Sequence, residues 1–176
     1  MSQGFYPRFR RPGQVYTHDF IPAGWYPKSP LVKEYPGSVP SKISKVAAEA
    51  HGSYSVGHLQ AAVLLARTTV EAVAKAKGIT QGSLVSKIDE LYNQHLVYEH
   101  VRDAAHEVRF VGNDAAHGDL VEDPIDEEEA AAILELMDMV LEGVFIAPAK
   151  TAAQKAARQA RKDAGTAAHP AATGSS

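Results

Sequence analysis

The spacing of apolar residues in this chain changes near residue 40. From Ser41 onward, apolar positions recur at alternating intervals of three and four, which places side chains on one face of an α-helix. The longest such series is Val56, Leu59, Val63, Ala66, Val70 and Val73. Leu64 and Leu65 widen the face that this series forms. The pattern predicts an all-α fold.

Five helices are predicted between residues 41 and 148. Their expected ranges are 42–51, 56–77, one beginning near 83, one beginning near 99 and one beginning near 126. Gly52 is expected to end the first helix and Gly78 the second, because glycine readily adopts the backbone conformation that ends a helix. Together the five helices predict a compact bundle.

The fifth predicted helix has the clearest start. Asp126 and Glu129 have the spacing of a capping box, and the acidic first turn suits the positive end of the helix dipole. Pro148 is expected to end the domain. The predicted core face of the helix consists of Ile133, Leu134, Met137, Val140, Leu141, Val144 and Phe145.

Residues 1–40 are expected to form an extended arm, because seven of the ten prolines lie there and proline is incompatible with a helix interior. Eight of the thirteen aromatic residues also lie there: Phe5, Tyr6, Phe9, Tyr16, Phe20, Trp25, Tyr26 and Tyr35. We favour packing of these rings on the bundle or on a sister subunit. The alternative is stacking on unpaired bases beside the arginines of the arm. Separately, the arm is a candidate surface for a protein partner.

Charge is distributed unevenly along the chain. Residues 1–40 carry a net charge of +3, residues 41–149 a net charge of −10, and residues 150–176 a net charge of +4. The segment 149–176 is rich in alanine and is expected to be either a fraying helix or a disordered tail. The acidic domain is unsuited to coating DNA, so contact with nucleic acid is expected to be local or made by the tails.

The sequence also excludes several classes of site. It contains no cysteine, and its histidines lack zinc spacing, so no metal and no cofactor are expected. There is no phosphate-binding glycine motif. No signal peptide and no apolar run of membrane-spanning length occurs, so we expect a cytoplasmic protein with no membrane contact.

The candidate chemical site lies on the fourth predicted helix. On a helical wheel, Arg102, His106, Arg109, Asn113 and His117 fall within an arc of about 80°, along one edge of the predicted core face. An imidazole can move a proton near neutral pH, a guanidinium can bind a phosphate and an amide can orient it. The pattern therefore suits phosphodiester cleavage, with His117, Arg109 and Asn113 as catalytic residues and Arg102 and His106 as binding residues.

A structural interpretation of the same residues stays open. Asn113 can cap a helix, His117 can bond a backbone carbonyl and Arg109 can pair with a carboxylate. Gly112 either lies within a continuous helix or ends it before a second short helix.

The order of several segments resembles the domain-of-unknown-function family 4145 over about residues 36–148. The segments are V-P-S-K-I, A-A-V-L-L-A-R-T-T-V-E-A-V, G-S-L-V-S-K-I-D-E-L, V-R-F-V-G-N-D-A-A-H-G-D and E-E-A-A-A-I-L-E-L. That family is grouped with the HEPN superfamily of helical bundles. The resemblance implies a bundle that dimerises and binds RNA or nucleotides, with metal-independent ribonucleases of defence and toxin–antitoxin systems among its relatives. In ribonuclease members an arginine and a polar residue precede a histidine; here Gly112 takes the arginine place, and Arg109 is the nearest substitute.

Two hypotheses follow. The first is a homodimeric RNA- or nucleotide-associated domain that acts as a metal-independent endoribonuclease. The second is a non-catalytic, dimerising interaction module in which G-N-D-A-A-H is structural.

Overall fold

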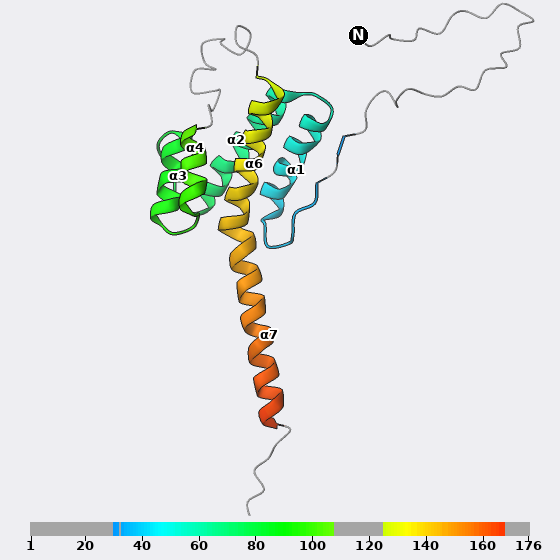
Figure 1. Cartoon of the computed structure of the whole chain (residues 1–176), viewed down its shortest axis with the longest axis vertical. Coiled ribbons are helices and arrows are strands. Elements are labelled where there is room, and N and C mark those ends of the chain that lie inside the picture. Colours follow the sequence, from blue (N-terminus) through cyan, green and yellow to red (C-terminus); the bar gives the residue numbers. More distant parts are fainter. Residues whose placement is uncertain (1–29, 32, 108–124, 168–176) are drawn as a thin grey trace, which may run out of the picture.

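A computed structural model describes residues 30–31, 33–107 and 125–167, and it confirms the predicted all-α fold. Within these described residues, five helices form a compact bundle, from which a sixth, α7, projects (Figure 1). The bundle helices are α1 (Ser41–Ser55), α2 (Leu59–Ala76), α3 (Leu84–Asn93), α4 (Glu99–Glu107) and α6 (Glu127–Leu141). A π-helical turn, η2 (Glu142–Ile146), joins α6 to α7 (Ala147–Ala167).

Helix α2 lies between α1 and α6 and also contacts α3, while α4 packs on α3 and α6. The predicted seam of α2 is buried at Val63, Ala66, Val70 and Val73. Leu65 packs against the core, whereas Leu64 is 44% exposed, so only one of the two leucines widens the buried face. The helix begins at Leu59 rather than residue 56 because the preceding residues form the turn that follows α1.

Helices α3 and α6 begin where their side-chain caps predict. Ser83 Oγ accepts a hydrogen bond from the backbone N–H of Ser86 over 3.2 Å at the start of α3. Asp126 and Glu129 form the predicted capping box of α6, with a 2.8 Å bond from the Glu129 N–H to Asp126 Oδ1. All seven predicted core residues of the fifth helix are buried or packed against the core.

The prediction that Gly52 ends the first helix is wrong, because α1 continues to Ser55. Gly52 is buried under the arm, with Pro30 Cβ and the Leu31 carbonyl each 3.6 Å from where a Cβ would stand. Ser55 Oγ donates to the Gly52 carbonyl over 2.7 Å and accepts from the Leu31 N–H over 2.8 Å. Tertiary contacts of this kind override the ~1 kcal/mol by which glycine disfavours a helix.

Helical structure does not stop at Pro148, the residue that is predicted to end the domain. The chain continues as α7 to Ala167, so the helical alternative for the tail is observed as far as that residue. In η2 the bonding register shifts by one residue, and the Ala147 N–H donates to the Glu142 carbonyl five residues back. Pro148 then falls in the first turn of a new α-helical stretch, where its missing N–H is not required.

The π turn packs closely against the connection between α3 and α4. A Cβ on Gly143 would lie 3.0 Å from the Leu96 carbonyl oxygen and 3.3 Å from Val97 Cγ1. Glycine therefore allows the rod formed by α6, η2 and α7 to lie against this loop.

The arm contacts the bundle at its described end. Tyr35 packs against the core and Val39 is buried, which agrees with the packing interpretation for this one aromatic residue. The other seven aromatic residues of the arm lie outside the described residues. Among the helices described, none combines the length and the apolar character that crossing a membrane requires.

Candidate functional site

Helix α4 carries two residues of the predicted site, Arg102 and His106. Val101 and Ala105 of this helix are buried, with exposed fractions of 2% and 1%. Each candidate residue follows one of these buried positions and is therefore rotated by about 100° from it. Arg102 and His106 consequently lie one turn apart at the rim of the buried face.

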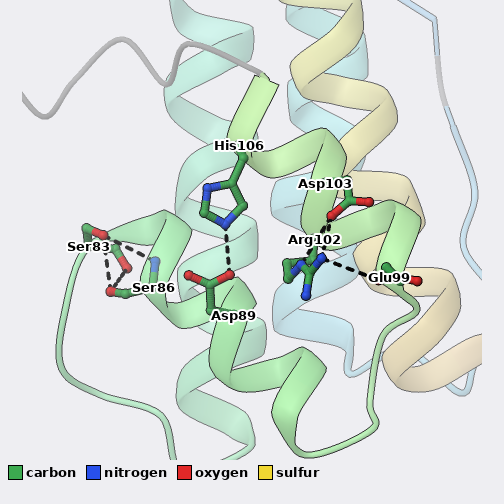
Figure 2. A network of polar contacts seen from close by, with 7 residues as sticks. All are labelled: Ser83, Ser86, Asp89, Glu99, Arg102, Asp103 and His106. Atoms are coloured by element: carbon green, nitrogen blue, oxygen red, sulfur yellow. Dashed lines mark hydrogen bonds and ion pairs between the residues drawn. The ribbon is translucent and has the colours of Figure 1, made fainter.

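The guanidinium of Arg102 is held by carboxylates of its own helix (Figure 2). Nη2 and Nε donate to Asp103 Oδ1 over 2.7 and 3.2 Å, and Nη2 lies 3.5 Å from Glu99 Oε1. Its Cζ stands 4.6 Å from the centre of the Tyr92 ring, a cation–π distance. The hydrogen bond to Asp103 is the main cause that raises the pKa of Arg102, so the group remains cationic.

The imidazole of His106 faces α3 and meets Asp89 there, with 2.9 Å between Nε2 and Oδ1 (Figure 2). The side chains are 51% and 38% exposed, so both remain accessible to a ligand. The carboxylate of Asp89 fixes the orientation of the ring and occupies Nε2. Nδ1 is left to exchange a proton with a ligand or with solvent. An imidazole oriented by a carboxylate is an arrangement that general acid–base catalysis uses.

These side chains line one open depression of about 440 Å³. Its lining consists of Asp89, Arg102, Asp103, His106 and Glu107. Three carboxylates thus surround one guanidinium and one imidazole, and Glu99 adds a fourth carboxylate beside Arg102. The described part of the site is therefore acidic, and it binds a phosphate only if further cations complete it.

The three residues predicted to be catalytic, Arg109, Asn113 and His117, lie outside the described residues. The structure accordingly places Arg102 and His106 on one edge of α4, while the five-residue edge as a whole stays a prediction.

Sequence reasoning missed the partners that α3 supplies to this edge. Asp89 and Tyr92 flank the buried Leu91, at helical spacing within the third predicted helix. Their spacing places them at the rim of the buried face of α3, but it does not say which helix that rim meets. The pairing becomes visible only when α3 and α4 are placed side by side.

Sequence reasoning also missed a second polar cluster, the arm cluster, formed by Lys33, Tyr35, His51 and Asp138. Lys33 Nζ forms an ion pair with Asp138 Oδ2, and the Tyr35 hydroxyl donates to Asp138 Oδ1 over 2.7 Å. His51 Nε2 lies 3.0 Å from Asp138 Oδ2 and 3.2 Å from Lys33 Nζ. The cluster joins the arm to α1 and α6, and its contacts with Asp138 of α6 span 87 to 105 residues of sequence.

The imidazole in the arm cluster has two alternative hydrogen bonds. When His51 Nε2 carries a proton, it donates to Asp138, and when it carries none, it accepts from Lys33. Burial raises the pKa of the Tyr35 hydroxyl above its usual range, and the hydrogen bond to Asp138 and its negative charge act in the same direction. Tyr35 therefore stays protonated and serves as a hydrogen-bond donor.

Fold and site together define a helical-bundle protein with an acidic core domain, a polar edge on α4 and a projecting basic helix. The chain belongs to the DUF4145 family, described as a domain of unknown function, whose model matches residues 48–171. The matched region includes α7 and extends beyond Pro148. No curated protein and no solved structure matches the chain.

Proposed function

We propose that this protein is an RNA-associated helical domain of the HEPN type, with its site on the edge of α4 and in the segment that follows. The observation that carries the proposal is the position of Arg102 and His106, which lie one turn apart on α4 and line the same open depression. The chain after α4 adds a guanidinium at Arg109, an amide at Asn113 and an imidazole at His117. Together they form the set of groups that phosphodiester chemistry uses.

In the catalytic form of this proposal the reaction needs no metal. Arg109 binds the phosphate, Asn113 orients it and His117 serves as a general acid or base. A base takes the proton of the ribose 2′-hydroxyl, whose oxygen attacks phosphorus. The bond from phosphorus to the 5′-oxygen breaks, and that oxygen receives a proton from the acid. The products are a 2′,3′-cyclic phosphate and a 5′-hydroxyl.

A second copy of the chain is part of this proposal. Two α4 edges facing each other across a two-fold axis would place the guanidinium groups of both copies, those of Arg102 and Arg109, around one phosphodiester.

Incubation of the purified protein with mixed RNA in EDTA tests the catalytic form. We expect cleavage by the wild type and loss of cleavage in His117→Ala, with His58→Ala as a control imidazole in the turn between α1 and α2. No cleavage by the wild type, or equal cleavage by wild type and His117→Ala, eliminates catalysis. Absence of binding to 2′-O-methylated RNA, which cannot be cleaved, eliminates the RNA association itself.

The carboxylates around Arg102 favour a second candidate, a non-catalytic interaction module. Its guanidinium already has Asp103, Glu99 and the Tyr92 ring as partners. The module predicts that Arg102→Ala changes the melting temperature but leaves RNA binding unchanged. Weaker RNA binding by Arg102→Ala at an unchanged melting temperature contradicts it.

A further inference from the structure

Helix α7 leaves the bundle and continues away from it as a single rod (Figure 1). From Lys150 to Ala164 every residue is exposed. An Ala-rich helix of this length is only marginally stable alone in water, so its stability depends on its continuity with α6 and on what its surface binds.

The side chains of α7 separate into two opposite faces. At 100° per residue, the seven alanines from Ala149 to Ala164 (149, 152, 153, 156, 157, 160 and 164) occupy an arc of about 140°. The five cations occupy an opposite arc of about 140° and span about 18 Å along the helix axis. They are Lys150, Lys155, Arg158, Arg161 and Lys162.

The basic face, defined by these five cations, has few intramolecular partners. Lys150 pairs with Glu142 over 2.9 Å. Lys155, Arg158 and Arg161 form no ion pair within the described part of the chain, and the one acidic residue of α7, Asp163, accepts a hydrogen bond from Gln159. The acidic bundle of the same copy cannot neutralise this face, because the helix projects away from it.

We propose that the basic face of α7 binds the phosphate backbone of RNA. This inference rests on the proposed association with RNA, but not on cleavage. Charge complementarity supports it, because clustered Lys and Arg side chains on an exposed surface attract phosphates while the bundle, at −10 over residues 41–149, repels them. Contact with the bundle is therefore limited to the proposed site at the α4 edge, while α7 binds the backbone of the strand and positions it relative to that site.

The composition of α7 favours RNA over a protein partner. Protein interfaces gain most of their affinity from a few large side chains buried in an apolar centre, with aromatic residues prominent among them. Between 149 and 167 the helix offers only alanine, glycine and threonine besides polar and charged side chains. A polyanion needs no apolar anchor, whereas a stable protein interface does.

Binding to a 2′-O-methylated single-stranded RNA oligonucleotide, measured by fluorescence anisotropy across a salt series, tests the proposal. If about four cations contact phosphates, the logarithm of the binding constant falls with the logarithm of salt concentration at a slope of about −2.8. The triple variant Lys155→Gln, Arg158→Gln, Arg161→Gln should reduce the slope to about −0.7 and weaken binding about a hundredfold at roughly 0.1 M salt.

The matched control replaces three exposed lysines of the bundle, Lys42, Lys45 and Lys75, with glutamine. It lowers the net charge equally, so the proposal requires its RNA affinity to stay within about twofold of the wild type. Glutamine is a good helix former, and equal helical content of both variants by circular dichroism confirms that α7 persists.

The possible outcomes separate the two proposals. RNA binding that is equal in the wild type and the α7 variant overturns the role of α7 and leaves the association with RNA standing. Absence of binding by the wild type overturns both. Concentration-dependent self-association in light scattering that the α7 variant loses, without a loss of RNA affinity, assigns the face to a second copy instead.

Discussion

Two polar clusters of this molecule are built from the same kinds of residue. The arm cluster pairs Asp138 with His51 over 3.0 Å, and the α4 edge pairs Asp89 with His106 over 2.9 Å. Each has a cation beside an aromatic ring, Lys33 with Tyr35 in the first and Arg102 with Tyr92 in the second.

The clusters differ in burial and in what they connect. His51 is 15% exposed and its cluster joins three segments far apart in sequence, whereas His106 is 51% exposed and joins neighbouring helices. Exposed ion pairs contribute little to stability, while polar groups left unpaired on burial are costly. We infer that the arm cluster holds the fold together and that the α4 edge is available for a ligand.

The largest expected effect comes from Asp138→Ala, which removes the shared acceptor of the arm cluster. Lys33, Tyr35 and His51 then lose a charged partner in a half-buried site, and we expect the free energy of unfolding to fall by about 2 kcal/mol. Thermal denaturation should show a melting temperature lower by roughly 5–10 °C. Asp138→Asn, which keeps the size of the side chain, should lie between this variant and the wild type.

A melting temperature of Asp138→Ala equal to that of the wild type would contradict the structural role of the arm cluster. It would then follow that the arm is held by its apolar contacts, such as those of Val39, and that neither cluster is structural.

A smaller effect is expected for Tyr35→Phe, about 1 kcal/mol near neutral pH, because one hydrogen bond to a carboxylate is lost. The raised pKa of Tyr35 adds a pH dependence. The folded protein holds the phenolic proton more tightly than the unfolded chain, so this contribution is complete below the unfolded pKa of about 10 and is lost as the pH rises above it. Urea denaturation at pH 8 to 11 should therefore show a steeper loss of stability in the wild type than in Tyr35→Phe, and parallel losses would contradict this origin of the shift.

The smallest effect is expected for Asp89→Ala, which breaks the exposed pair with His106. We expect the free energy of unfolding to change by less than about 1 kcal/mol. If the α4 edge binds RNA, the same variant should change its affinity, because the imidazole loses its fixed orientation. A loss of stability as large as that of Asp138→Ala would make the α4 edge a second structural cluster.

Much of the fold could be predicted from the sequence because a buried helical face leaves a periodic pattern. The seam from Val63 to Val73 and the face from Ile133 to Phe145 were identified in this way. Caps with side-chain hydrogen bonds, such as Asp126, were also predicted, because they depend on residues three positions apart. Gly52 was wrongly predicted to end a helix, since contact with the arm decides its conformation. The continuation of the helix past Pro148 depends on a change of hydrogen-bond register, which the spacing of residues does not predict.

The candidate site was less predictable than the fold. The edge formed by Arg102 and His106 follows from spacing within one helix, and the structure places both there. Their partners Asp89 and Tyr92 belong to another helix, and a helical wheel contains no information on which helices meet. The arm cluster was missed for the same reason, because its residues come together only through packing of the arm, α1 and α6.

The π turn before α7 determines the direction in which the basic helix faces. The π turn contains one residue more than a turn of α-helix, and this extra residue rotates all that follows by about 100° around the helix axis. Deleting a single residue from Glu142–Ile146 would therefore turn the cations to a different side of the molecule without changing their number, their spacing or the composition of the helix. A mutation of one codon, far from the charges themselves, can therefore change the side of the molecule on which the charged surface lies.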